Sequence, residues 1–394
     1  MIAKDDDFRS AFGIGQEGAF AVMAMFYLAY ALAQVPAGWL ADRYGARKMM
    51  TGYVLLWSAC TIMTGLAGGL MLLLASRFLF GLAQAGCYPT SGSLIKRWMP
   101  LGARGKASSC VSMGGRIGGV IAPALTGLLL FRYMDWRQVL VLYGVFGLLV
   151  AADYWRTIRE TPAEHPQCNQ EENELVIADG GEDSRKAPPF PPIKALIFNA
   201  SMWRMCLMQF CVNVGWVFLV TGLPDYLKIV HHQNSEQIGV MQSVVLFSGI
   251  AGVIVGGPAT DWMLQRFGLQ KGRAIPLYTA KFIACAAFLS CLWLDASPWT
   301  VVMALSVVAF MTDFGIPATW AYMMDVGGRN AAAVFGWGNM WGNFGAALAT
   351  YVVPSILKIW DVNGDWHEAF LMCAGGFLVA GIAAFGLNAK SKVE

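Results

Sequence analysis

Long apolar segments alternate with short polar ones along nearly the whole chain. A helix needs about 20 predominantly apolar residues to cross the hydrocarbon of a bilayer, where irregular backbone facing lipid would leave polar groups unpaired. Segments of this kind occupy residues 17–40, 49–68, 70–95, 106–131, 138–157, 202–224, 236–260, 274–294, 298–325, 331–358 and 367–388. This pattern predicts an all-α integral membrane protein with about eleven transmembrane helices.

The region between residues 158 and 199 departs from this pattern. It is rich in acidic residues and then in proline, as in PPFPP at 188–192. Such a composition is typical of a solvated connection, here with one short helix predicted near Ile193–Phe198. The chain is therefore predicted to contain an N-terminal bundle of five helices (1–157), a linker (158–199) and a C-terminal bundle of six helices (200–394).

Composition supports a membrane protein and excludes several other classes. The chain is 57% hydrophobic and 13% charged, whereas soluble proteins carry about 25% charged residues. A net charge of +3 is too small to indicate nucleic-acid binding. The nine cysteines lie mostly within apolar runs and lack CxxC spacing, so neither a metal site nor a disulfide framework is predicted. No cofactor is expected.

The basic residues of the loops predict the orientation. Lys and Arg concentrate in every second loop, from the one after the first span to the C-terminus, and are sparse in the loops between. Basic residues favour the cytoplasmic side of a membrane. The linker and the C-terminus are therefore predicted to be cytoplasmic, in a multi-pass protein of the inner or plasma membrane, and the odd number of spans places the N-terminus outside.

Two segments repeat one motif. GWLADRYGARK (38–48) follows the first span, and GPATD (257–261) with RFG (266–268) follows the seventh. Both place Gly four residues before Asp and then continue with Arg, an aromatic residue and Gly. Many secondary transporters consist of such repeated bundles. Two spans lie between the linker and the second copy but only one precedes the first, so a helix is expected to be missing before it. Either the gene start is assigned too late, which the sequence favours, or the protein has eleven helices.

The first of these segments closely resembles the signature loop between helices 2 and 3 of the major facilitator superfamily. Other segments resemble its anion:cation symporter branch, which includes hexuronate, galactonate and phthalate carriers and vesicular glutamate transporters; they are RFLFG (77–81), WMP (98–100), TPAEHP (161–166), DVGGR (325–329) and NMWGN (339–343). The resemblance implies a major facilitator fold with two pseudosymmetric helical bundles. It also implies a monomer in the lipid bilayer that moves a small organic anion, such as a sugar acid, by alternating access with H⁺ or Na⁺ symport.

The repeated motif implies a gate on the cytoplasmic side. Its predicted gating residues are Gly38, Asp42, Arg43, Gly45, Arg47, Asp261 and Arg266. A carboxylate at such a helix junction can accept hydrogen bonds from the start of a neighbouring helix and pair with nearby guanidinium groups. In the resembled family this cluster holds one access state closed. The alternative is ordinary anchoring by positive charge.

Two polar residues of the third span are candidates for substrate binding. An uncompensated Arg within a bilayer costs at least ~2.5–3.5 kcal/mol, so Arg77 requires a partner or water. The resemblance implies that Arg77 binds an anion, while a structural ion pair is the alternative. Gln84 stands where the family often has a proton-carrying Glu. An amide cannot titrate, so Gln84 is expected only to hydrogen-bond the substrate.

Arg116 and Asp313 are predicted to lie near the middle of the membrane. Arg116 lies ~18 Å along a helix that begins near Lys106, and Asp313 reaches a similar depth in the other half. A central site is predicted in which Arg116 binds substrate and Asp313 couples its uptake to protons; the alternative is a buried ion pair that joins the halves. Tyr30 and Asn339 either line the same site or connect helices. Lys281 is long enough to reach the cytoplasmic face, and a structural role is expected for it.

Functions other than symport stay open at this point. An integral membrane enzyme would need a nucleophile and base or metal ligands, and the chain has no GxSxG or HExxH motif, so no catalytic residue is predicted. A facilitator, an exchanger and a truncated, non-transporting paralogue share the same sequence features. Dependence of uptake on a proton gradient distinguishes symport from these.

Overall fold

The fold is entirely helical within the part of the chain that the structure describes. The computed structural model describes residues 6–14, 16–178, 191–293, 297–360 and 366–393, and none of these lies in a strand. Eight of its helical stretches are long and apolar enough to cross a membrane. Two of the eight, Ser235–Ser290 and Pro298–Ala349, contain 56 and 52 residues, far more than one crossing needs. The all-α membrane fold is confirmed, and the number of eleven spans stays a prediction.

The helices of the N-terminal half come before the linker. They are α1 (Asp6–Phe12), α2 (Gln16–Tyr44), α3 (Ala46–Gly65), α4 (Leu70–Ala85), α5 (Cys87–Trp98), α6 (Arg104–Arg132) and α7 (Trp136–Thr157), with a 3₁₀ turn at Leu101–Ala103. Helices α4 and α5 continue one another across Gly86, where an added methyl group would meet the ring of Tyr53. Their junction therefore packs directly on α3.

The described part of the linker, residues 158–178 and 191–199, contains short helices. A 3₁₀ turn at Pro162–Glu164 is followed by α8 (Gln170–Ala178) and α9 (Ile193–Phe198). The short helix predicted near Ile193–Phe198 is confirmed. Residues 179–190, with much of the proline-rich run, lie outside the described part of the chain.

The helices of the C-terminal half follow α9. They are α10 (Ala200–Val217), a π-helical turn (Phe218–Gly222), α11 (Leu223–Ile229), α12 (Ser235–Ser290), α13 (Pro298–Phe314), α14 (Ile316–Gly327), a 3₁₀ turn (Gly328–Asn330), α15 (Ala331–Trp360) and α16 (His367–Phe385). Helix α12 is broken at Gly268, where φ is 72°. Gly45, which stands at the matching position of the repeated motif between α2 and α3, has φ of 102°. Both copies therefore use glycine where a side chain would strain the backbone.

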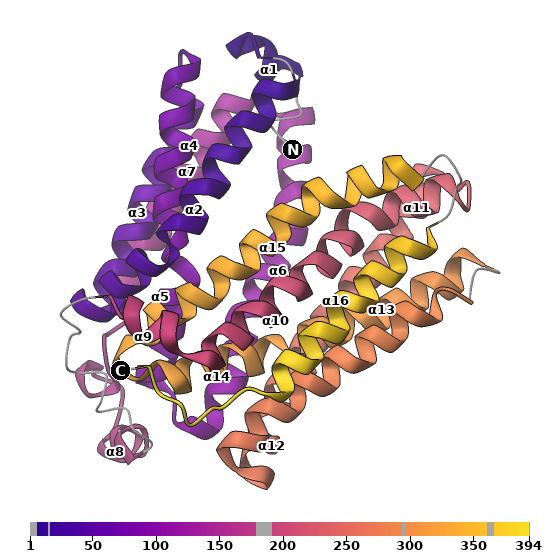
Figure 1. The fold of residues 1–394 in the computed structure, drawn as a ribbon. Helices are drawn as coiled ribbons and strands as arrows, with labels where there is room; N and C mark the ends of the chain where they lie inside the picture. The colour runs from indigo at the N-terminus through magenta and orange to yellow at the C-terminus, as the bar shows by residue number, and fades with distance from the viewer. Residues whose placement is uncertain (1–5, 15, 179–190, 294–296, 361–365, 394) are drawn as a thin grey trace.

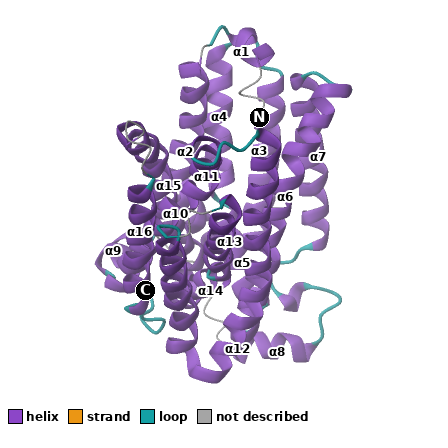
Figure 2. Ribbon diagram, turned by 90° about the vertical axis from the view of Figure 1, so that its right-hand side faces the viewer, coloured by secondary structure: helices purple, strands orange, loops and turns teal. Residues whose placement is uncertain are grey.

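The two halves converge at one end of the molecule. In Figure 1 the helices of the N-terminal half, in indigo to magenta, and those of the C-terminal half, in red to yellow, meet near α5 and α14 and separate toward α1 and α11. Helix α8, helix α9 and the C-terminus lie at the end where the halves meet, which we call the linker side. The view turned by 90° shows the long helices running between the two ends (Figure 2).

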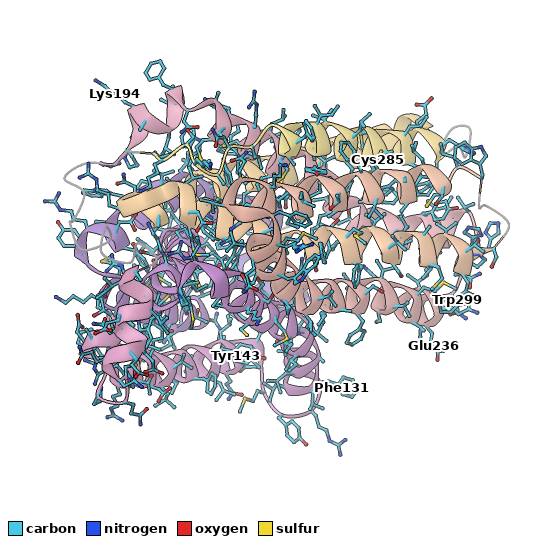
Figure 3. The ribbon with its side chains drawn as sticks, turned by 90° about the horizontal axis from the view of Figure 1, so that it is seen from below. Phe131, Tyr143, Lys194, Glu236, Cys285 and Trp299 are labelled. Atoms are coloured by element: carbon cyan, nitrogen blue, oxygen red, sulfur yellow. The ribbon has the colours of Figure 1, made fainter. Side chains whose placement is uncertain are left out.

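The surface of the molecule is strongly apolar. The side chains of Phe131, Phe146 and Ile382 are 93%, 64% and 61% exposed, and Phe131 projects outward from the end of α6 (Figure 3). The largest apolar core lies in the C-terminal half, where Met205 and Phe288 are fully buried. Soluble monomers rarely expose large contiguous apolar patches. This outer surface is suited to lipid.

Candidate functional site

Two aspartates, one from each copy of the repeated motif, hold the halves together on the linker side. Asp42 at the end of α2 accepts 3.0 Å hydrogen bonds from the backbone N–H groups of Ala332 and Ala333 at the start of α15. Asp261 in α12 accepts 2.8 and 2.9 Å hydrogen bonds from the backbone N–H groups of Gly105 and Lys106 at the start of α6. The first N–H groups of a helix lack partners within the helix and favour a negative charge. Each half therefore caps a helix of the other, and we call these two contacts the latch.

Glycines allow the helices of the latch to approach each other closely. An added methyl group at Gly38 of α2 would meet the backbone carbonyl of Ala332. Added methyl groups at Gly105 of α6 and Gly257 of α12 would each meet the backbone carbonyl of the other residue. Small residues at such crossings permit contact between helix backbones. The predicted gating residue Gly38 thus lies in the contact between the halves.

The glycine contacts predict the effect of a larger side chain. Gly257→Val is expected to shift the protein toward a state that is open on the linker side, because the Cβ atom and the two methyl groups that it carries cannot fit against α6. The measurement is maleimide labelling of a cysteine at Ser109, which lies at the α6–α12 contact, in a background without other cysteines. Gly52→Val is the control, because a methyl group added there meets nothing within 4 Å beyond the neighbouring backbone of its own helix. Equal labelling of the two variants would contradict the expectation.

A buried charge cluster joins the halves beside the latch. Asp325 in α14 pairs with Arg104 of α6 at 2.6 Å and with Arg273 of α12 at 2.7 Å. Arg273 also donates a 3.0 Å hydrogen bond to the carbonyl of Leu101 and is 0% exposed. Losing these cations would leave a buried carboxylate unpaired, which would strongly destabilise the folded protein. No role is predicted for these residues from the sequence; their signal is that each lies at the end of an apolar span.

Glu160 at the start of the linker caps α3. Its carboxylate accepts 2.7 and 2.9 Å hydrogen bonds from the backbone N–H groups of Ala46 and Arg47 and forms an ion pair with Arg97. A side chain at Gly45 would meet this carboxylate. The acidic linker is predicted to be solvated, and Glu160 is an exception because it anchors the linker to the N-terminal half.

The predicted cations of the gate lie mainly against aromatic rings. The guanidinium group of Arg43 lies 5.4 Å from the ring centroid of Trp39, and that of Arg47 lies 4.0 Å from the ring centroid of Trp155. Arg266 is exposed. The carboxylate of Asp42 instead lies within electrostatic range of Arg97. Arg97 is thus a further basic residue of this region that the sequence analysis does not single out.

Arg116 and Asp313 form an ion pair between the halves. The guanidinium group of Arg116 in α6 bonds Oδ1 of Asp313 in α13 and lies 4.1 Å from the ring centroid of Trp216 in α10. The side chain of Arg116 is 29% exposed, while that of Asp313 is 0% exposed. A fully buried carboxylate needs a partner, and Arg116 is accessible enough to exchange this partner for another anion.

A second polar group lies near this pair. Asn339 of α15 donates a 3.1 Å hydrogen bond to the side-chain oxygen of Gln34 in α2, and Tyr30 is a hydrogen-bonding neighbour of both. Tyr88 of α5 interacts electrostatically with Tyr30 and with Arg116. The structure therefore brings the predicted residues Arg116, Asp313, Tyr30 and Asn339 into one region around Tyr88, which the sequence analysis missed. We call this group the central cluster.

Other predicted residues lie outside the central cluster. Arg77 donates a 2.5 Å hydrogen bond to the hydroxyl of Thr64 in α3, and its guanidinium group lies 5.0 Å from the ring centroid of Phe80. These contacts belong to the N-terminal half. Gln84 is half-buried near the end of α4.

Lys281 is buried beside the central cluster. Its side chain is 2% exposed, with Nζ 3.4 Å from the carbonyl oxygen of Thr312 and within electrostatic range of Asp313. Lys281 is long enough to reach the cytoplasmic face, but its contacts are with α13 instead. Its helix packs against α13 on the side that carries this lysine, and the negative charge of Asp313 offsets the cost of burying the ammonium group.

The sequence is similar to a known protein family and to individual transporters. The family profile of the Major Facilitator Superfamily matches residues 3–350. A probable galactarate/D-glucarate transporter of Bacillus subtilis strain 168 is 29% identical over 380 residues, which cover 92% of this chain and 82% of that protein. A probable sulfoacetate transporter of Cupriavidus necator is 26% identical over 376 residues, which cover 95% and 85%.

A solved structure shows the same fold. The human organic anion transporter MFSD10 superposes with a TM-score of 0.69 at 17% identity, covering 96% of this chain and 88% of its own. At this identity the likeness concerns the arrangement of the helices alone.

Proposed function

Because this chain belongs to the major facilitator superfamily, we propose that it is a secondary active transporter that carries a small organic anion across a membrane by alternating access. The family and the fold class predicted from the sequence are confirmed, and the chain is a multi-pass membrane transporter rather than an enzyme. Relatives named for galactarate, D-glucarate and sulfoacetate support an organic anion as substrate. We place the linker side in the cytoplasm, from the distribution of basic residues.

The Arg116–Asp313 pair is the observation that carries this proposal. A guanidinium group binds carboxylates and sulfonates through two parallel N–H donors. A substrate anion that reaches the exposed part of Arg116 competes with Asp313 for these donors. Asp313 is then a buried carboxylate that has lost its ion pair with Arg116 and keeps only the more distant Lys281, and it takes up a proton. Binding of the anion and uptake of H⁺ are thereby linked at one residue pair between the halves.

The latch supports two access states. The linker side is closed here by Asp42, Asp261 and the cluster around Asp325, and the halves separate toward the other end (Figure 1). Hydrogen bonds to a charged group contribute about 1.5–3 kcal/mol each. Opening the linker side therefore costs several such bonds, and binding of substrate and proton offsets this cost. In this proposal, residues 1–157 and 200–394 are the two units that move relative to each other.

Uptake into liposomes tests the proposed function. The purified protein is reconstituted and supplied with radiolabelled D-glucarate or sulfoacetate under an imposed proton gradient. We expect saturable accumulation that a protonophore abolishes and that a sodium gradient alone does not drive. Exchange without accumulation would instead identify a facilitator or exchanger. A folded, reconstituted protein that moves no organic anion would contradict the proposal.

Arg77 is retained in the proposal as an anion-binding residue. Arg77→Lys keeps the charge but loses the planar pair of donors, so we expect the KM for the anion to rise about tenfold, the equivalent of one charge-assisted hydrogen bond. Thr64→Val is the matched control, because it removes the hydrogen-bond partner of Arg77 without removing the guanidinium group. If both variants lower the maximal rate equally and neither changes KM, Arg77 is structural.

A further inference from the structure

A polar cavity lies at the linker side of the C-terminal half, away from the central cluster. Its volume is about 380 Å³, and it forms where α9, the start of α10 and the chain after α16 meet. Its polar lining comes from Asn199, Ser201, Arg204, Asn388 and Ser391. Among the described residues that form this lining, none is acidic.

Hydrogen bonds among the lining residues fix the cavity. Asn199 donates a 3.3 Å hydrogen bond to the hydroxyl of Ser391, and the backbone N–H of Asn388 donates a 2.8 Å bond to the hydroxyl of Ser201. The hydroxyl of Ser201 also lies 2.6 Å from that of Tyr322. These contacts tie the residues after α16 to the start of α10. The cavity is thus formed before any ligand binds.

Arg204 supplies a cation to this cavity. Its guanidinium group has five N–H donors, and the one hydrogen bond that it makes within the described residues goes to the carbonyl of Gly386. The side chain is exposed. Lys194 on α9 and Lys390 after α16 are also exposed, and Lys194 projects from the outer edge of the molecule (Figure 3). The cavity is therefore suited to an anion.

Exposed apolar side chains surround the same cavity. Phe198, which lines it, is 85% exposed, while Ile197 and Trp203 are 44% and 38% exposed. Leu196 of the same short helix is 0% exposed, so α9 packs through one side and presents its apolar residues on the other. Aromatic and basic residues at the end of a membrane helix are typical of the headgroup region of a bilayer.

We propose that this cavity binds the phosphate group of an anionic phospholipid from the linker-side leaflet. Arg204 neutralises the phosphate, and the hydroxyl and amide groups of Ser391 and Asn199 lie within the same lining. The acyl chains lie along the apolar side chains of Ile197, Phe198 and Trp203. A free phosphate ester has no acyl chains and so gains nothing from this apolar surface, which is the reason for assigning the site to a lipid.

Lipid titration tests the site independently of transport. The purified protein in phosphatidylcholine nanodiscs is titrated with phosphatidylglycerol, and the lipid that stays bound is counted by native mass spectrometry. We expect the wild-type protein to retain phosphatidylglycerol and Arg204→Gln to lose about fivefold or more of that affinity. Lys271→Gln is the control, because Lys271 is an exposed basic residue on α12, outside the cavity lining, and it should bind as the wild type does.

Two further arms make the outcome decisive. Ser391→Asp places a negative charge in the cavity wall and should weaken phosphatidylglycerol binding even if Arg204→Gln does not fold. Glycerol phosphate at millimolar concentration should not displace the bound lipid. Unchanged lipid binding by folded Arg204→Gln and Ser391→Asp overturns the proposal. Displacement by glycerol phosphate overturns the assignment to a lipid and identifies a site for soluble phosphate esters.

Discussion

Replacing Asp42 with Asn is expected to lower transport at least tenfold while the protein stays folded in the membrane. The carboxylate accepts hydrogen bonds from the first two N–H groups of α15 and a 3.1 Å bond from the hydroxyl of Ser93. An amide has one acceptor oxygen and no charge, so at least one of these bonds is lost. A loss of about 1.5–3 kcal/mol changes the balance between access states by roughly ten- to a hundredfold.

The measurement combines uptake with accessibility. Asp42→Asn should slow uptake of the labelled anion in liposomes and raise maleimide labelling of a cysteine at Ser109 on the linker side. Asp261→Asn should act in the same way, because Asp261 makes the matching pair of bonds to α6. Asp153→Asn is the control, since Asp153 is exposed on α7. Unchanged uptake by a well-expressed Asp42→Asn variant would count against the latch.

The reciprocity of the latch explains why one substitution should act on the whole molecule. Asp42 of the N-terminal half caps α15, and Asp261 of the C-terminal half caps α6. Neither contact can open while the other keeps the halves in place, since both lie between the same two units. Losing one cap therefore weakens the closed state as a whole, as expected for a bistable interface.

The helices and the repeat could be predicted from the sequence because each has a local signal. Apolar runs of membrane length mark the spans, and the repeated motif marks Gly45 and Gly268, which both take positive φ. Helix boundaries were harder to derive. The spans predicted at 236–260 and 274–294 lie on either side of Gly268, where a non-helical φ of 72° and ψ of 175° break α12 into two helices. Helical backbone nevertheless extends into the polar residues around Gly268, which a hydropathy pattern assigns to a loop.

The depth of a residue in the membrane could be predicted from the sequence, but which side of its helix faces the interior of the protein could not. Each helical residue advances about 1.5 Å, which places Arg116 and Asp313 at similar depth, and the structure joins them. A helix that is apolar on all sides carries no signal of which side faces inward. This is why the burial of Lys281 and the contact of Arg77 with Thr64 could not be predicted from the sequence.

The partners of the latch could not be predicted from the sequence. Asp42 bonds backbone N–H groups 290 and 291 residues away, and Asp261 bonds N–H groups 156 and 155 residues away. Backbone donors have no residue-type signature, so only the packing of the two halves identifies them. Glu160 illustrates the same limit, because its acidic neighbours in the linker give no sign that this residue caps α3.

Asp313→Asn is expected to abolish proton-driven accumulation while exchange of labelled for unlabelled anion continues. Asn cannot bind a proton, so the link between anion binding at Arg116 and proton uptake is removed. Arg116 keeps its charge and its position over the ring of Trp216, and it still attracts the substrate. The loss of coupling should therefore be complete, whereas the loss of counterflow should be partial.

The experiment measures both activities in the same liposomes with an imposed pH gradient. Asp313→Glu is the matched variant, because it keeps a titratable carboxyl and should retain some proton-driven uptake. Gln84→Asn is a second control, since it alters the residue at the position where the resemblance to the family implies a Glu, without removing a carboxyl. Because Gln84 cannot titrate, proton-driven uptake should persist in this variant even if anion binding weakens. Accumulation that still follows the proton gradient in Asp313→Asn would show that the coupling group lies elsewhere, and loss of both activities together would place Asp313 in substrate binding or folding rather than in coupling.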